Sequence, residues 1–246
     1  MNSCEQVAQK YRGLRFNGIA EILKELLGQA EANEYSYLEF ADALVSQELA
    51  SRERKRIKQN MRRAGVPVQK RLEEFDFRAQ TTITKREITN LLDFQFIDNR
   101  NNLVFIGPAG VGKTHLAISV GIKAVEAGYK VLFVTALSLL EVLEIAELKG
   151  ELKKKINNLL KFDLIILDEL GYLPMNKQAM YNLFQLINAM YEYRSLIITT
   201  NKDFTSWHEF FFDDNVAIPI VDRIIHHSKI FMLGGESYRL RQKLSG

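Results

Sequence analysis

A glycine-rich stretch of eight residues constrains the fold of this chain more than any other feature of its sequence. It follows an apolar run at residues 103–106 and reads Gly107-Pro108-Ala109-Gly110-Val111-Gly112-Lys113-Thr114. The pattern G-x-x-x-x-G-K-[ST] surrounds phosphates with backbone N–H groups, while its lysine reaches the β- and γ-phosphates and its hydroxyl ligates Mg²⁺. A helix that begins at Lys113 would add the favourable field of its N-terminus. The sequence therefore predicts a nucleotide-binding loop between a strand and a helix.

Short apolar runs recur along the chain and are separated by segments with helical spacing. They lie at residues 103–106, 131–134, 164–167, 195–199 and 229–233. Strands that alternate with helices indicate a parallel sheet covered on both faces. Thr84 and Glu87 have the spacing of a capping box and predict a helix before the first strand. We therefore expect an α/β domain over residues 85–246, built on a five-stranded parallel sheet.

The front of the chain has a helical pattern instead. Apolar residues at 19–27 fall on one helix face, and residues 37–45 repeat that spacing, with a break expected at 28–36. These patterns predict a small all-helical module at residues 1–67 that binds DNA or a partner. Residues 68–84 are expected to form a connector, in which two phenylalanines would anchor onto the next domain. The two are Phe75 and Phe77.

Positive charge is concentrated at the end of the helical module. Residues 1–50 carry four Lys or Arg against eight Asp or Glu, whereas residues 51–71 carry nine Lys or Arg against Glu53 alone. Such a segment would bind DNA phosphates and release counterions whatever the base sequence. A solvated helix face, or a site for an acidic protein, is the alternative. The candidate DNA-binding residues are Arg52, Arg54, Lys55, Arg56, Lys58, Arg62 and Arg63.

Polar side chains follow two of the expected strands. Asp168 can hold the coordination shell of Mg²⁺, and Glu169 beside it can polarise a water for attack on the γ-phosphate. Asn201 ends another strand, where its amide could donate to the γ-phosphate or orient the attacking water. The alternative is that it caps the turn or the helix near Thr205. The carboxyl ends of parallel strands meet at one edge, where α/β sheets bind ligands. Because a water needs a base beside it, the second acid favours hydrolysis over phosphoryl transfer to a small molecule.

The composition excludes several other classes of protein. A hydrophobic content of 47%, 26% charged residues and a net charge of +3 exclude extensive disorder. No apolar run approaches the roughly 18 residues of a membrane span, and the first residues lack the pattern of a secretion signal. A single cysteine, Cys4, forms no internal disulfide, and the four histidines lack metal-ligand spacing. We expect a cytoplasmic protein without a membrane contact.

Several motifs together resemble AAA+ ATPases of the IstB/DnaC type, which are transposition helper ATPases and bacterial replicative helicase loaders. The resemblance covers residues 70–243 closely and is closest to IstB proteins, the ATP-binding partners of insertion-sequence transposases. It implies an AAA+ fold whose C-terminal helical lid is absent or minimal, because only 45 residues follow Asn201. The motifs are Gly107–Thr114 with His115-Leu116-Ala117, Leu167-Asp168-Glu169-Leu170-Gly171-Tyr172, Ile198-Thr199-Thr200-Asn201, Asp222-Arg223-Ile224 and Gly235-Glu236-Ser237-Tyr238-Arg239.

The resemblance also implies roles for three residues near the phosphates. Asn201 matches the sensor-1 position, Arg223 the arginine finger that reaches the γ-phosphate of a neighbouring subunit, and Arg239 the sensor-2 arginine. An arginine at developing phosphate charge accelerates the reaction by orders of magnitude, and one supplied in trans ties hydrolysis to assembly. A surface or interface salt bridge is the alternative for either arginine. ATP and Mg²⁺ are the expected cofactors, bound between the subunits of a homo-oligomer.

These features lead us to expect an ATPase that assembles on double-stranded DNA in its ATP state and controls where a cognate transposase acts. A helicase loader, which engages a hexameric helicase through its N-terminal module, is the runner-up. A small-molecule P-loop kinase would need an acceptor pocket and a lid, and the sequence indicates neither. A nucleotide-gated scaffold that barely hydrolyses ATP would carry the same motifs.

Overall fold

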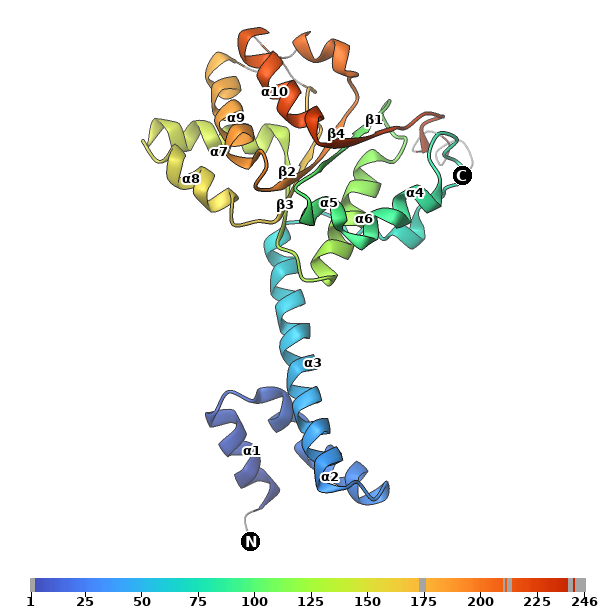
Figure 1. Ribbon diagram of the computed structural model, residues 1–246, viewed down its shortest axis with the longest axis vertical. Helices are drawn as coiled ribbons and strands as arrows, with labels where there is room; N and C mark the ends of the chain where they lie inside the picture. Colours follow the sequence, from blue (N-terminus) through green and yellow to red (C-terminus); the bar gives the residue numbers. More distant parts are fainter. Residues whose placement is uncertain (1–2, 173–175, 210, 212–213, 239–240, 242–246) are drawn as a thin grey trace. The chain divides into compact units, whose positions relative to one another are not determined.

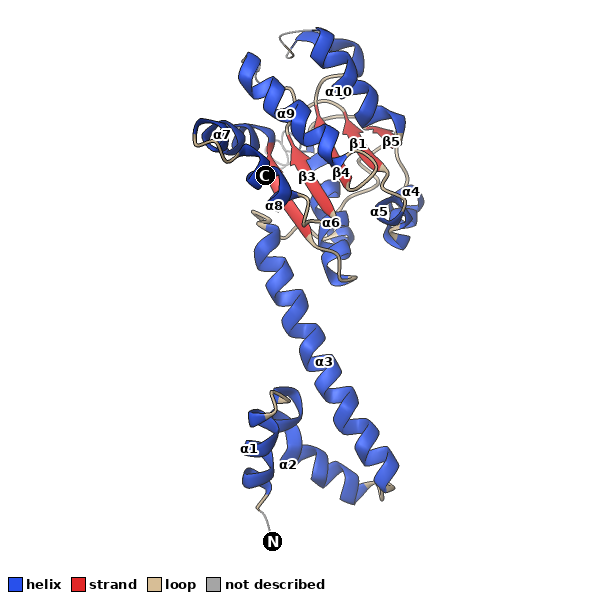
Figure 2. Ribbon diagram, turned by 60° about the vertical axis from the view of Figure 1, so that its left-hand side comes forward, coloured by secondary structure: helices blue, strands red, loops and turns tan. Residues whose placement is uncertain are grey.

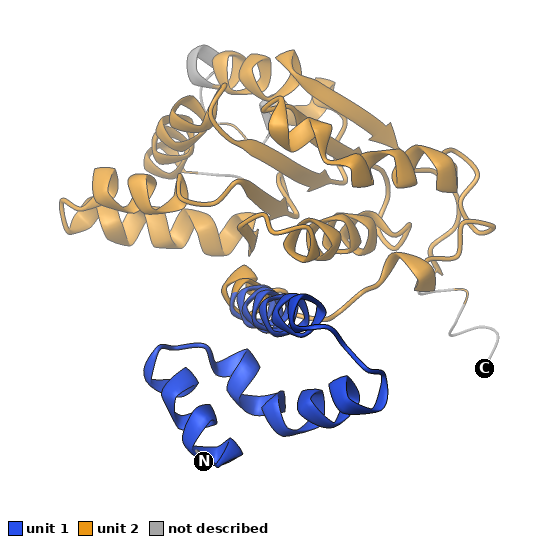
Figure 3. Ribbon diagram, turned by 60° about the horizontal axis from the view of Figure 1, so that its bottom comes forward, with its two compact units in different colours: residues 1–59 blue, residues 60–246 orange. Residues whose placement is uncertain are grey.

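The computed structural model describes residues 3–172, 176–209, 211, 214–238 and 241. The chain forms two compact units, Met1–Gln59 and Asn60–Gly246 (Figure 3). One helix, α3 (Tyr37–Ala64), runs through the boundary between them. Among the described residues, no helix combines the length and the apolar character needed to cross a bilayer.

The first unit contains α1 (Cys4–Gly13), α2 (Asn17–Ala32) and the first part of α3. Its small core includes buried Ala8, Ile19, Ala20 and Leu23. The expected break at 28–36 is shorter than predicted, because α2 continues through Gly28 to Ala32. A glycine inside a helix costs about 0.5–1 kcal/mol, and the apolar face that α2 buries outweighs this cost.

A buried carboxylate joins α3 to α2. Glu48 of α3 accepts hydrogen bonds from the N–H groups of Gly18 at 2.7 Å and Ile19 at 3.2 Å, at the start of α2. These bonds satisfy two of the N–H groups that a helix start leaves unpaired. Burial opposes ionisation of Glu48, but hydrogen bonds from Arg52 and from these two N–H groups outweigh it and hold its pKa below 4.5.

A five-stranded parallel sheet forms the centre of the second unit, in the order β2-β3-β4-β1-β5. Every predicted strand is confirmed, with each end within one residue of its predicted position. Because β1 pairs with β4 and β4 with β3, the carboxyl ends of these three strands lie next to one another. The strands are β1 (Asn102–Ile106), β2 (Val131–Thr135), β3 (Leu164–Asp168), β4 (Ser195–Thr200) and β5 (Ser228–Met232).

Helices cover both faces of this sheet (Figures 1 and 2). α6 lies on one face, where its Gly121 meets Ile166 of β3, whereas α7 to α10 pack on the other. The predicted capping box is confirmed, since the Thr84 hydroxyl accepts a hydrogen bond from the Glu87 N–H at the start of α4. The helices are α4 (Lys85–Thr89), α5 (Gln95–Asp98), α6 (Lys113–Glu126), α7 (Ala136–Leu148), α8 (Leu152–Leu159), α9 (Lys177–Met190) and α10 (Asp214–His226). The 3-10 helices are η1 (Leu72–Glu74), η2 (Asn90–Asp93) and η3 (Phe204–Glu209).

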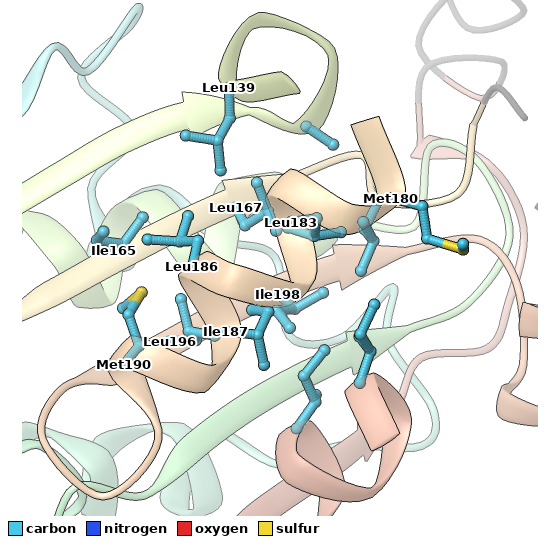
Figure 4. Packing of buried hydrophobic residues seen from close by; sticks show 14 of the residues in the cluster. Leu139, Ile165, Leu167, Met180, Leu183, Leu186, Ile187, Met190, Leu196 and Ile198 are labelled. Carbon is cyan, nitrogen blue, oxygen red and sulfur yellow. The ribbon is translucent and has the colours of Figure 1, made fainter. Parts of the chain in front are cut away.

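The largest buried cluster lies between the sheet and the helices α7 to α10 (Figure 4). Alternate side chains of β3 and β4 point into it, as the two-residue period of a strand requires. This packing holds the carboxyl ends of β3 and β4 rigidly at the sheet edge. The members labelled in Figure 4 are Leu139, Ile165, Leu167, Met180, Leu183, Leu186, Ile187, Met190, Leu196 and Ile198.

The predicted connector, residues 68–84, lies within the second compact unit. As expected, Phe75 anchors it onto the domain: its ring packs edge-on against His115 of α6, with ring centroids 5.3 Å apart. Phe77 packs against Phe75. Buried Gln80 donates a hydrogen bond from Nε2 to the carbonyl oxygen of Val111 at 3.2 Å. The connector is therefore packed against the glycine-rich loop.

Candidate nucleotide-binding site

The glycine-rich loop joins β1 to α6, as the sequence predicts. Its backbone turns through left-handed conformations at Gly110 and Gly112, with φ of 83° and 102°. A Cβ at Gly110 would overlap the Ser237 hydroxyl, and one at Gly112 would lie 2.5 Å from Cε2 of Phe75. Both positions require glycine, because a side chain would meet a neighbouring residue and strain the backbone.

A cavity of about 380 Å³ opens beside this loop. Its volume lies in the range of small-molecule sites, about 300–1,000 Å³. The loop, the strand ends and the connector, which are far apart in the sequence, meet around it. The residues that line it include Glu74, Phe75, Ala79, Gln80, Ala109, Gly110, Val111, Gly112, Lys113, Thr114, His115, Glu169, Tyr172, Thr199, Thr200 and Asn201.

Two side chains of the loop form hydrogen bonds that fix their positions. The Lys113 ammonium donates hydrogen bonds to the carbonyl oxygens of Gly107 and Pro108, both at 2.7 Å. These bonds hold it over the loop. Thr114 Oγ1 donates to Oδ1 of Asp168 at 2.8 Å. The hydroxyl and the carboxylate at the end of β3, both predicted as Mg²⁺ ligands, therefore lie within hydrogen-bonding distance of each other.

Asp168 is buried, with 4% of its surface exposed. Its Oδ1 also accepts a hydrogen bond from Thr199 Oγ1 of β4 at 2.5 Å. Two hydroxyl donors thus satisfy the hydrogen-bonding capacity of one oxygen of this buried side chain. A hydroxyl and a carboxylate at this spacing are the hard oxygen ligands that Mg²⁺ takes together with phosphate oxygens, so Thr114 and Asp168 fit that ion. The described residues contain no group of three or more His, Cys, Asp or Glu that would hold a metal alone.

Glu169 follows directly and lies at the wall of the cavity with its side chain exposed. Its backbone has φ of 62°, a left-handed conformation that costs energy for any residue with a Cβ. The Thr199 hydroxyl accepts a hydrogen bond from the Glu169 N–H at 3.0 Å. Thr199 therefore contacts both acids. The sequence analysis assigns no role to Thr199. Its signal in the sequence is a polar residue near the end of an apolar strand.

Asn201 follows β4 and lines the same cavity. The alternative, that it caps a helix near Thr205, is wrong, because Asp203 makes that cap. Asp203 Oδ1 accepts hydrogen bonds from the Ser206 N–H at 3.0 Å and from the Thr205 hydroxyl. The structure thus places Asn201 at the same cavity as the loop and Glu169.

Of the two arginines suggested by the family resemblance, Arg223 lies within the described residues and Arg239 does not. Arg223 of α10 does not line the cavity; it packs against the rings of Phe184 and Tyr191. Arg239 lies outside the described residues. The residue before it, Tyr238, donates a hydrogen bond from its N–H to the carbonyl oxygen of Gly110 at 3.1 Å.

All seven candidate DNA-binding residues are exposed on α3. Three of them have carboxylate partners: Arg52 with Glu48, Lys55 with Glu21 and Arg56 with Glu53. Within the described part of the chain, the other four have no carboxylate within ion-pair distance. These unpaired cations are Arg54, Lys58, Arg62 and Arg63.

Comparison with known proteins agrees with this geometry. The family described as IstB-like ATP binding protein matches residues 9–246. The chain is 38% identical to the ATP-binding protein named for insertion sequence IS5376 of Geobacillus stearothermophilus, over 97% of this chain and 95% of that protein. It is 39% identical to the one named for insertion sequence IS21 of Pseudomonas aeruginosa, over 94% of this chain and 87% of that protein.

Solved structures share the fold of this chain over two thirds or more of its length. The DnaC helicase loader is 20% identical with a TM-score of 0.55, and the match covers 67% of this chain and 97% of that one. AMPPCP-bound DnaA from Aquifex aeolicus is 20% identical with a TM-score of 0.56, over 74% of this chain and 56% of that one. The predicted AAA+ fold is therefore confirmed. With the match over residues 9–246, the chain belongs to the IstB-like ATP-binding protein family.

Proposed function

We propose that this protein hydrolyses ATP, assembles on double-stranded DNA in its ATP-bound state and thereby regulates where a partner transposase acts. One observation carries the catalytic part: buried Asp168 accepts hydrogen bonds from Thr114 and Thr199, and these two threonines line one cavity together with Glu169. Relatives named as ATP-binding proteins of insertion sequences support the transposition part.

The loop and the strand ends would divide the chemistry of hydrolysis between them. Thr114 and Asp168 would hold Mg²⁺, which neutralises charge on the phosphates when it is bound. Lys113 would exchange its bonds to the loop carbonyls for bonds to the β- and γ-phosphates. Glu169 would orient a water and accept its proton, while the oxygen–phosphorus bond to the γ-phosphate forms and the bond to ADP breaks. Asn201 would donate from its amide to the γ-phosphate.

An assembled state would complete the site. Arg223 lies outside its own cavity, so its contribution requires the nucleotide of a second copy of this chain. ATP sites between subunits of a homo-oligomer would meet that requirement, and hydrolysis would then depend on assembly. Arg239 is assigned to the same phosphates by resemblance alone.

DNA binding would use the exposed basic residues of α3. The unpaired cations form no ion pair with a carboxylate in the described part of the chain, so they could bind a phosphate without breaking one. They are therefore the strongest candidates for phosphate contacts. Arg52 is the weakest of the seven, because its Nε bonds to buried Glu48 at 2.8 Å. Contacts of this kind are independent of base sequence and weaken as salt concentration rises.

A replicative helicase loader is the second candidate. It is favoured by large apolar side chains at the start of α3, a surface that a protein partner could cover. Tyr37 is 98% exposed and Leu38 is 80% exposed. Exposed apolar groups of this size often mark protein interfaces.

The test measures ATP hydrolysis and duplex binding together for the wild type, Lys113→Ala and Glu169→Gln. We expect duplex DNA to stimulate hydrolysis by the wild type and ATP to strengthen its assembly on duplex. Glu169→Gln should bind ATP and DNA without turnover, and Lys113→Ala should lose the ATP dependence of DNA binding. Lys85→Ala, an exposed lysine outside the cavity, serves as the matched control. If duplex and ATP have no effect on each other, the proposal fails and binding to a replicative helicase is tested instead.

A further inference from the structure

Arg223 is a half-buried cation without a carboxylate partner among the residues that the structure describes. One hydrogen bond runs from its Nη1 to the carbonyl oxygen of Pro219, one turn earlier in α10, at 3.0 Å. Partly buried charges are normally paired, because losing water without a counter-ion is costly. The surface ion pair that the sequence left open for this arginine is therefore not present in the described part of the chain.

Two aromatic rings hold the guanidinium in place of a counter-ion. Its central carbon lies 5.5 Å from the ring centroid of Phe184 and 5.9 Å from that of Tyr191. Both distances are within the range of about 6 Å for cation–π contacts. Phe184 belongs to α9, and Tyr191 immediately follows that helix. Such contacts engage the face of a guanidinium, whereas its N–H donors point outward along its edge.

Tyr191 is itself held in a defined orientation. Its hydroxyl lies 2.6 Å from Nδ1 of His226, at the end of α10. Its ring stacks on His226 and His227 at interplanar angles of 22° and 23°. These contacts connect the end of α9 to the end of α10, and the Tyr191 ring that makes them also contacts Arg223.

We propose that Tyr191, together with Phe184, is a positioning residue that holds the Arg223 guanidinium ready for the γ-phosphate of ATP bound by a second copy of this chain. The inference rests on the proposed function, in which Arg223 acts on the nucleotide of a neighbouring subunit. A guanidinium already restricted by two rings loses less side-chain freedom when it meets the phosphate. Its remaining edge donors match the geometry of phosphate oxygens.

The direct test removes the ring and keeps the arginine. In the assembled protein, with duplex DNA and saturating ATP, Tyr191→Leu should lower kcat about tenfold and leave the KM for ATP unchanged, because a misplaced group costs rate at the chemical step. Tyr191→Phe keeps the ring face and should retain most of kcat. Tyr193→Leu is the matched control: Tyr193 lies two residues away, is 67% exposed and makes no ring or cation contact in the described structure. It should hydrolyse ATP at the wild-type rate.

Two further measurements separate positioning from a merely structural role. In an Arg223→Ala background, Tyr191→Leu should cause no additional loss, because the two residues act through one guanidinium. Mixing Tyr191→Leu subunits with Glu169→Gln subunits should restore turnover above that of either alone. The Glu169→Gln subunits cannot hydrolyse ATP, but they present an intact Tyr191 and Arg223 to their neighbours. Phe184→Leu repeats the series if Tyr191→Leu fails to fold.

Three results would overturn the inference, and they are distinguishable. If Arg223→Ala loses activity while Tyr191→Leu and Phe184→Leu keep it, the rings do not position the arginine, although the proposed function stands. If Arg223→Ala hydrolyses ATP at the wild-type rate, the role of this arginine in trans fails together with the inference. If the variants weaken duplex binding and leave kcat unchanged, the guanidinium contacts DNA phosphates instead of a nucleotide.

Discussion

The hydroxyl of Thr199 offers a sharp test of how Asp168 and Glu169, the two acids proposed for hydrolysis, are held. It donates to Oδ1 of Asp168 at 2.5 Å and accepts from the N–H of Glu169 at 3.0 Å. Thr199→Val removes both hydrogen bonds but keeps the volume and the β-branched shape of a strand residue. The change therefore alters polarity at a side chain that is 1% exposed, with little change in packing.

The magnitude follows from these two bonds. A hydrogen bond to a charged acceptor contributes about 1.5–3 kcal/mol, and an amide left unpaired out of water costs about 1–3 kcal/mol. The Glu169 amide is only partly buried, so its share is at the lower end. We expect Thr199→Val to lower the free energy of unfolding by about 3 kcal/mol. If Glu169 is no longer fixed and the activation free energy of hydrolysis rises by about 1.4 kcal/mol, kcat falls about tenfold.

Denaturant unfolding and steady-state hydrolysis measure the two effects. Ser195→Ala is the matched control, since Ser195 is a buried hydroxyl at the opposite end of the same strand, where it donates to the carbonyl oxygen of Phe96 at 3.1 Å. It should destabilise the fold by about 1 kcal/mol and leave kcat unchanged. Equal kcat values for Thr199→Val and Ser195→Ala would refute the view that Thr199 holds the catalytic acids in place.

Three other predictions concern DNA, the loop and the helical module. Replacing the four unpaired cations of α3 by Gln should reduce the slope of log K against log salt by about 3.6, measured by fluorescence anisotropy on duplex DNA. The exposed lysines Lys10 of α1 and Lys24 of α2 serve as controls, and an unchanged slope would exclude α3 as the DNA-binding surface. Gly112→Ala should weaken ATP binding at least about tenfold by calorimetry, because φ is 102° there; wild-type affinity would contradict this loop geometry. The Gly18 amide shift in NMR should titrate with a midpoint below 4.5, since Glu48 accepts from that amide. The pKa of Glu48 is lowered in the folded state, so its stabilising effect is complete above pH 4.5 and is lost on acidification below it. A midpoint at or above 4.5 would contradict this stabilisation of the Glu48 carboxylate.

Features encoded by neighbouring residues could be predicted from the sequence. The glycine-rich loop, the five apolar strands and the acids after β3 are each specified within a few consecutive residues. Because parallel strands with helical crossovers place their carboxyl ends at one edge, local patterns alone predicted that Asp168 and Thr114 lie near the same Mg²⁺. The direct hydrogen bond of 2.8 Å between these side chains was not predicted. Gly28 is the opposite case: its local preference predicted a break, but the buried face of α2 carries the helix past it.

Features that depend on distant segments could not be predicted in this way. Phe75 was recognised as an anchor, yet its place against Gly112 and His115 requires the connector to fold back over the loop. Arg223 shows the same limit more clearly. The family resemblance suggests a role for the arginine, but the sequence contains no local sign that the rings of Phe184 and Tyr191 replace a counter-ion. Where side chains from separate helices create the environment of one charge, tertiary packing decides what that charge is free to bind.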